Sequence, residues 1–258
     1  ATIGFTMKQS EFTLPNPPIV EAVLDIECDL QPGQQLTALE EPARNTFGDH
    51  YPKFRVQLIQ EHLIETKPDA PVELSVRHGV QAYQFLNDDE KQLVQVRSQG
   101  YSFNRLAPYS SLDDYLQEIE RTWRLYVELA KPVQIRLIRL RYINRILLPL
   151  DEGRVQLDDY FNVAPHLPDE DKLTFISFLN QHSAVEAETG NEVNIILTTQ
   201  PLDGGRLPVI FDNTVTSPTL GEPDDWAWIS SKILVLRALK NNIFRRALTD
   251  KCLDLFRQ

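Results

Sequence analysis

The 258-residue chain is acidic, with 37 Asp and Glu against 26 Lys and Arg and a formal net charge of −11. This charge disfavours sequence-blind binding to nucleic acid or to an anionic membrane, because such affinity comes from basic groups that displace counterions from phosphate. A hydrophobic content of 42% excludes a disordered chain and predicts one large core or two modest ones.

Cysteine usage and the lack of long apolar runs indicate the compartment. The two cysteines, Cys28 and Cys252, stand near opposite ends of the chain. Isolated thiols without a secretion signal are typical of a reduced, cytoplasmic protein, and no apolar run reaches the roughly 18 residues of a membrane span. Residues 1–13 are interpreted as a flexible N-terminal extension. We therefore expect a cytoplasmic protein without membrane contact.

The first half of the fold is predicted to span residues 14–131. Apolar and acidic residues alternate from Ala22 to Leu30, and this period of two predicts a half-buried strand. The elements expected after it are a helix at 34–47, strands at 54–64, 72–78, 80–86 and 92–106, and a helix at 112–130. Gly79 and Gly100 are expected to interrupt the strands, and Ser111 suits the start of the second helix.

The second half is predicted to span residues 132–258 and to repeat this order loosely. It begins with a long strand, KPVQIRLIRLRYINRILL at 131–148, which carries several arginines. The elements expected after it are a short helix at 157–163, strands at 173–179, 183–188, 193–199 and 208–217, and a long helix at 225–248 with a last turn to Phe256. Gly190 and Gly204 stand at two of the expected turns.

This order of elements predicts an α+β fold. Each half reads strand, helix, three or four antiparallel strands and long helix, so the chain is interpreted as two pseudo-repeated β-α-β(3–4)-α halves within one compact unit. Together the halves would form a curved antiparallel sheet with the two long helices on one face, a TATA-binding-protein-like architecture. The residues of the halves do not align, so the expected repeat is structural only.

Three stretches resemble one known family. They are LPNPPIVEAVLDIEC at 14–28, YVELAKPVQIRLIRLRYINRI at 126–146 and LRALKNNIFRRALTD at 236–250. These stretches are similar to motifs of an uncharacterised prokaryotic family described as sporadically distributed, and the resemblance covers nearly the full chain. It implies no catalytic or binding residue. The patchy distribution of that family suggests mobile-element or defence-associated genes.

Familiar catalytic and cofactor motifs are absent from the sequence. It contains no Walker-type loop, no G-x-G-x-x-G, no G-x-S-x-G and no C-x-x-C. The acidic pairs stand in turns and at helix starts, where carboxylates favour the helix dipole. A metal site built from His62, His78 and an acid on neighbouring strands is the arrangement left open. We assign no catalytic residue, no metal and no cofactor.

The arginines of the central strand are the candidate binding residues. Arg139, Arg141 and Arg145 share one face of a regular strand, and the apolar residues before them indicate a bulge near 137–139. Guanidinium groups suit phosphate or carboxylate. In this interpretation Asn144 and Trp226 would add hydrogen bonds or stacking to an anion-binding groove.

A structural interpretation of the same arginines is favoured over the anion groove. In a pseudo-twofold sheet the first strands of the two halves lie side by side. The acids of the first strand would then face the arginines and form cross-strand ion pairs with them. These acids are Asp25, Glu27 and Asp29.

The function expected from the sequence is that of a non-enzymatic binding or interaction module. Its working surface would be the sheet face without helices, and its partner would be a protein or a second copy of the chain. A nucleotide or nucleic acid is disfavoured by the net charge. The alternative is a hydrolase or nuclease whose carboxylates and histidines meet only in the fold. A pocket with two carboxylates and a histidine would favour that enzyme.

Overall fold

The fold comes from a computed structural model that describes residues 14–65 and 73–257 of the chain. The side chains of residues 61–65 and 73–77 are outside the description. The N-terminal extension predicted at residues 1–13 also lies outside the described residues. None of the described helices combines the length and the apolar character that a membrane-spanning helix requires.

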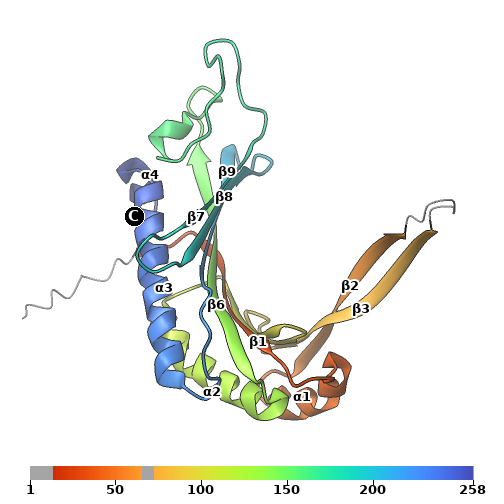
Figure 1. The fold of residues 1–258 in the computed structure, drawn as a ribbon. Coiled ribbons are helices and arrows are strands. Elements are labelled where there is room, and N and C mark those ends of the chain that lie inside the picture. Colours follow the sequence, from red (N-terminus) through yellow and green to blue (C-terminus); the bar gives the residue numbers. More distant parts are fainter. Residues whose placement is uncertain (1–13, 66–72, 258) are drawn as a thin grey trace, which may run out of the picture.

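The described residues form one nine-stranded antiparallel sheet in the order β2-β3-β4-β5-β1-β6-β9-β8-β7 (Figure 1). In chain order the strands are β1 (Ile19–Asp29), β2 (Lys53–Glu65), β3 (Glu73–Leu86), β4 (Gln92–Arg97), β5 (Gly100–Leu106), β6 (Gln134–Pro149), β7 (Leu179–Val185), β8 (Glu192–Thr199) and β9 (Arg206–Ser217). The expected α+β class and antiparallel sheet are confirmed. The first strands of the two predicted halves, β1 and β6, are neighbours at the centre of the sheet.

Helical segments lie between some of these strands and after the last one. They are the 3₁₀ turn η1 (Leu36–Leu39), α1 (Glu40–Phe47), α2 (Leu112–Ala130), the 3₁₀ turn η2 (Leu157–Asp159), α3 (Trp226–Ala247) and α4 (Asp250–Asp254). Side-chain caps explain where the longer helices begin. The hydroxyl of Ser111 accepts a hydrogen bond from the Asp113 amide at 3.3 Å, and the carboxylate of Asp225 accepts one from the Trp228 amide at 3.0 Å. Each cap satisfies an amide that has no partner within its own helix.

The prediction that Gly79 separates two strands is wrong, because β3 runs through this position opposite Ile59 of β2. The pairing of β2 with β3 shifts register between Gln57 and Leu58, so that Gln81 is an extra residue on β3. A glycine two residues from such a bulge relieves crowding without ending the strand. Gly100 does begin a new strand, as expected.

The strand expected at 173–179 is also wrong, and the strand expected at 183–188 is shifted to an earlier position as β7. Phe175 and Phe178 stack edge-on at 5.5 Å between ring centroids and pack against a core cluster. Phe178 is buried and Phe175 is half-buried in this contact, whereas Leu173, Ile176 and Leu179 are exposed. The apolar residues of this segment therefore do not share one buried face, as those of a strand would. The helix expected at 157–163 is reduced to the single turn η2.

Figure 1 shows a bent sheet with α1, α2 and α3 on its outer, convex side. The larger core cluster lies between these helices and the sheet and includes Ile26, Trp123 and Ile233. A second cluster, with Phe211 and Phe244, lies under the end of α3 and under α4. The larger cluster takes residues from both sides of position 131, so the two predicted halves share one core.

The inner, concave side of the sheet carries none of the described helices (Figure 1). We call it the helix-free face. Side chains alternate along each strand, so the residues of β1 and β6 that do not enter the core point to this face. It is the face on which the sequence placed its candidate residues.

Candidate functional site

Arg139 confirms the expected cross-strand ion pair on the helix-free face. It stands opposite Asp25 in the β1–β6 register, and its Nη1 lies 3.5 Å from Asp25 Oδ2 and 3.1 Å from Glu27 Oε1. The register of β1 shifts between Glu27 and Cys28, which leaves Arg136 as the extra residue of β6. Arg136 Nε is 3.2 Å from Asp29 Oδ1. The expected bulge is therefore present, one to three residues before its predicted place.

Asp25 is the centre of this network. Its Oδ1 accepts hydrogen bonds from Arg97 Nη1 at 2.9 Å and from Ser102 Oγ at 2.5 Å. The side chains of Asp25 and Arg97 are 13% and 19% exposed, whereas Ser102 is buried. Charges so withdrawn from water interact more strongly than surface pairs. Removal of the central carboxylate would leave Arg97 and Arg139 poorly compensated.

Arg141 and Arg145 form ion pairs with acids other than those of β1, which were predicted as their partners. Arg141 lies opposite Val23, which has no charge, and its Nε lies 3.0 Å from both carboxylate oxygens of Asp212 on β9. Arg145 lies beyond the paired part of β1 and binds Asp203 at 2.8 Å in the turn before β9. Strand β9 and its turn therefore supply carboxylates that only the sheet order could reveal.

An amide ladder extends the network toward the β2 edge. Gln84 donates to Gln95 at 3.0 Å, Gln95 donates to Asn104 at 2.8 Å, and Asn104 donates to Glu21 at 2.7 Å. Gln57 of β2 accepts a longer bond of 3.4 Å from Gln84. The ladder thus crosses β2, β3, β4, β5 and β1. It gives partners to amide groups that would be costly to bury without them.

The structure does not bring Asn144 or Trp226 together with the three arginines. Asn144 points to the helix-covered face, where it is buried and its amide donates to the Phe211 carbonyl at 3.1 Å. Trp226 is the first residue of α3 and packs against the larger core cluster. Residues of opposite parity on a strand face opposite sides, so Asn144 and Arg145 were never candidates for one groove.

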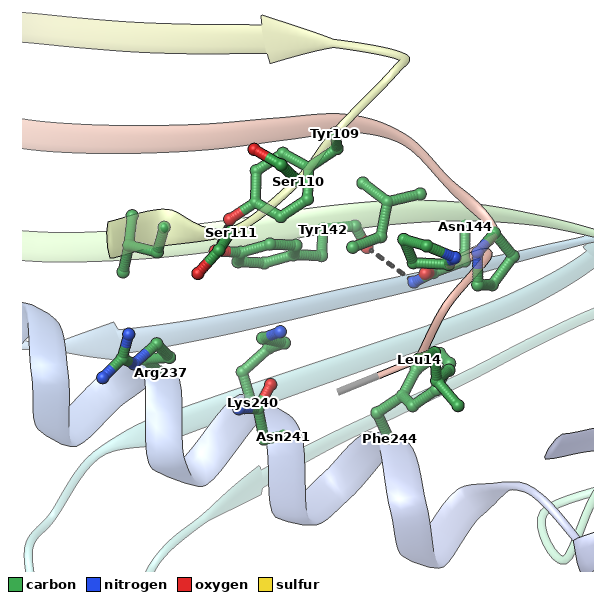
Figure 2. A pocket seen from close by; sticks show the side chains of 14 residues that line it. Leu14, Tyr109, Ser110, Ser111, Tyr142, Asn144, Arg237, Lys240, Asn241 and Phe244 are labelled. Carbon is green, nitrogen blue, oxygen red and sulfur yellow. Dashed lines mark hydrogen bonds between the residues drawn. The ribbon is translucent and has the colours of Figure 1, made fainter. Parts of the chain in front are cut away.

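A pocket of about 100 Å³ lies on the other side of the sheet, between β6 and α3 (Figure 2). Its lining residues come from the chain before β1, the loop before α2, β6 and α3; they are Leu14, Pro17, Pro18, Ile19, Tyr109, Ser110, Ser111, Leu112, Tyr142, Asn144, Arg237, Lys240, Asn241 and Phe244. Among the described residues of the lining there is neither a carboxylate nor a histidine. Figure 2 shows Lys240 reaching from α3 toward Tyr142.

Lys240 is the unusual residue of this pocket. Its Nζ lies 3.8 Å from the centroid of the Tyr142 ring, and the Tyr142 hydroxyl is 2.9 Å from that of Tyr109. Burial, with a smaller contribution from the charge of Arg237, lowers the pKa of Lys240 to about 7. Burial likewise raises the pKa of Tyr142 to about 12. A strongly shifted group in a pocket is a candidate for function.

Sequence reasoning missed Lys240, although a signal for it exists. The buried positions of α3 include Ile229, Ile233, Leu236 and Phe244, which recur at helical spacing. Lys240 occupies the place in this stripe between Leu236 and Phe244, where an apolar residue is expected. A lone lysine inside an apolar stripe indicates a buried ammonium group, and the surrounding basic residues conceal it.

The arrangement required by the enzyme alternative is not found among the described side chains. No group of three or more His, Cys, Asp or Glu in the described part of the chain could hold a metal ion. His166 does meet two acids, with Nε2 3.7 Å from Asp158 and Nδ1 3.1 Å from Glu170, but all three side chains are at least 60% exposed. The site considered at His62 lies outside the described side chains, and His78 is exposed.

Comparison with known proteins finds no matching family model, no matching curated protein and no matching solved structure. The resemblance to the sporadically distributed family therefore stays a prediction.

Proposed function

We propose that this chain is a binding module without catalytic activity, and that the helix-free face of its sheet holds a protein partner. The observation that carries the proposal is the series of paired polar groups on this face. They occur from the β2 edge to β7, where Gln181 and Ser183 donate to Asn194 at 2.9 and 3.0 Å. A sheet face that carries so many organised polar groups without a covering layer suits a polar partner.

Pairing of the arginines favours a protein partner over an anionic ligand. Phosphate would have to compete with Asp25 and Glu27 for Arg139 and with Asp212 for Arg141. It would also approach the carboxylate of Glu21, which is already bonded to Asn104. Like charges at such distances oppose each other. A nucleotide or nucleic acid would gain little on this face.

The partner we propose has a net basic surface in which amide and hydroxyl groups accompany the charges. The chain carries a formal charge of −11, which steers basic partners toward it and repels a second copy of itself. The exposed parts of Arg136 and Arg141, 43% and 45% of their side chains, would meet the partner's acids. Complementary charges of both signs then set the orientation.

The two halves are also proposed to be structural repeats in a TATA-binding-protein-like arrangement. Outward from the centre, the first half runs β1, β5, β4, β3, β2 and the second half runs β6, β9, β8, β7. In both halves the first strand is central and the others follow in reverse chain order. We further propose a cytoplasmic location, because Cys28 and Cys252 are buried free thiols, and the family resemblance supports a link to mobile or defence genes.

Photo-crosslinking in cells tests the binding face. A photoreactive residue is placed at Asn194 or Thr214, on two strands of the helix-free face, and at Leu234, which is exposed on α3. We expect one and the same protein to be cross-linked from Asn194 and Thr214 and not from Leu234. Cross-links from Leu234 alone would contradict the proposal.

Binding of the purified partner is then compared between the parent chain and a double variant, Arg141→Asp with Asp212→Arg. The exchange keeps an ion pair between β6 and β9 and reverses the charges that the face presents. We expect affinity to fall at least tenfold while the thermal unfolding midpoint stays within a few degrees. Unchanged affinity in a folded double variant would reject the face. Binding of a single-stranded oligonucleotide that disappears at high salt would favour the anionic alternative.

A further inference from the structure

The pocket beneath α3 is separate from the proposed binding face, since it opens on the helix-covered side of the sheet. Four segments that are distant in the chain build it: the segment around β1 supplies apolar side chains, and the other three supply polar ones (Figure 2). Pockets of this kind, with apolar walls and a few placed polar groups, are typical of small-ligand sites.

A cation without a counterion marks the interior of this pocket. Among the described residues no carboxylate forms an ion pair with Lys240, and the charged group that acts on it is Arg237, of the same sign. The Arg237 guanidinium is itself held by Asp113 at 2.8 Å, so this acid is already engaged at the start of α2. The ammonium rests on the face of Tyr142 instead, a contact that compensates only part of its lost hydration.

We propose that the pocket binds a small organic anion, a carboxylate with a short apolar tail, whose negative group pairs with Lys240. The tail would contact the apolar part of the lining, which includes Pro18, Ile19 and Phe244. The hydroxyls of Tyr109 and Tyr142 lie in the same lining and are 2.9 Å apart. One of them donates to the other, and the proton of the second hydroxyl is left to donate to the second carboxylate oxygen.

The size of the cavity limits this ligand. A cavity of about 150 Å³ holds the six heavy atoms of benzene, so the pocket, at about 100 Å³, encloses about four. Because the pocket is open at its mouth, one or two further atoms of a tail can extend outward, which gives a range of about four to six heavy atoms. Propionate and butyrate fall in this range. Acetate, with four heavy atoms, also fits but offers only one methyl group to the apolar wall, and sulfate has no apolar part at all.

Binding should depend on pH in a defined direction. Among the described residues, the titratable groups that line the pocket with Lys240 are Arg237 on its own helix, Tyr142 on β6 and Tyr109 in the loop before α2. Burial raises the pKa of both tyrosines, so they stay neutral near pH 7. Lys240, with a pKa of about 7 in the free pocket, must be protonated to pair with an anion. Affinity is therefore expected to fall as pH rises above 7, approaching tenfold per unit.

The test is a calorimetric titration of the full chain with acetate, propionate, butyrate and inorganic sulfate at pH 6 and pH 8. We expect propionate and butyrate to bind at least tenfold more tightly than acetate or sulfate, and more tightly at pH 6. Lys240→Met should lose this binding. Its control is Lys232→Met on the same helix, where the ammonium lies 5.7 Å from the Trp228 ring, outside the pocket.

Two results would overturn the proposal. One is equal affinity of the parent chain and the folded Lys240→Met variant for butyrate. The other is the absence of butyrate binding to the parent chain at 10 mM, about the weakest specific affinity of interest for so small a ligand. A chemical-shift measurement of the Lys240 side chain adds an independent readout, because a bound anion should raise its pKa.

Discussion

The two faces of the sheet differ in whether their partly buried charges have partners of opposite sign. On the helix-free face each of the four arginines of β6 has a carboxylate partner, and the acids come from β1, β9 and the turn before β9. On the helix-covered face the half-buried Lys240 is partly dehydrated by packing, and it has no acid beside it among the described residues. A face open to solvent can hold many charges because pairing and partial hydration act together. Between α3 and the sheet, the ammonium of Lys240 is tolerated because burial lowers its pKa, so that it is more easily deprotonated.

The largest effect that would break this contrast is expected at Asp25. Asp25→Asn keeps the shape of the side chain but removes the charge shared by Arg97 and Arg139. We expect a loss of about 3 kcal/mol in the free energy of unfolding, because two partly buried guanidinium groups lose compensation. Urea denaturation measures it. The control is Asp29→Asn, whose 49% exposed side chain should cost less than about 1 kcal/mol; equal losses would mean that the network is no more than surface pairing.

Lys240→Met should have the opposite sign. We expect it to stabilise the fold by about 2 kcal/mol at pH 6, because a desolvated ammonium is replaced by an apolar side chain of similar length. The gain should shrink between pH 7 and pH 10. In that interval the unfolded lysine, with a pKa near 10.4, binds more protons than the folded one at about 7, so the parent chain gains stability as pH rises. Unfolding curves at pH 6 and pH 9 that show the same difference would reject a buried, partnerless lysine.

The amide ladder provides a smaller test of the helix-free face. Gln95→Ala removes the side chain that joins Gln84 to Asn104. We expect a loss of about 1 to 2 kcal/mol, since Asn104 is buried and would lack one partner. The exposed Gln57→Ala, at the end of the ladder, is the matched change and should cost below about 0.5 kcal/mol. A thermal unfolding series that ranks the two variants in reverse order would contradict a ladder that stabilises the fold.

The smallest effect is expected at the β7 edge. Val185 is 65% exposed on an edge strand, so Val185→Lys should change stability by less than about 0.5 kcal/mol. Edge strands with exposed apolar residues tend to pair with other chains. If the parent chain self-associates through this edge, sedimentation velocity will show a dimer that the variant lacks. A dimer that survives the substitution would place the contact elsewhere.

The sequence pattern was sufficient to predict an element wherever its structure depends on interactions between residues close in the chain. The alternation of β1 and the cap at Ser111 act within a few residues, and these elements form as predicted. The neighbouring position of β1 and β6 was also anticipated, and with it the pairing of Arg139 with Asp25. Two predictions were wrong. At Gly79 the strand β3 continues, with a bulge two residues later, and at 173–179 two phenylalanine rings pack against each other outside a strand.

The candidate sites depended on longer-range facts. Asp212 and Asp203 became partners of Arg141 and Arg145 because β9 lies beside β6, and no pattern within β6 specifies its second neighbour. Asn144 lies on the opposite face from Arg145 because adjacent residues of a strand face opposite sides, and this could have been predicted from the sequence. The pocket required four segments to meet, so its existence could not be predicted from any one of them.

The amino-acid sequence by itself determined the α+β class, most element positions and the presence of arginines opposite acids, because periodicity, capping and turn chemistry act over a few residues. The tertiary structure decided which charged groups have a partner of opposite charge and which have none among the described residues. The reason is physical: an ion pair or a desolvated ammonium depends on which strands become neighbours and on how much water the packing excludes. In this chain the order of the strands places a carboxylate beside each arginine of β6. The packing of α3 on β6 partly dehydrates Lys240, and no carboxylate among the described residues pairs with it.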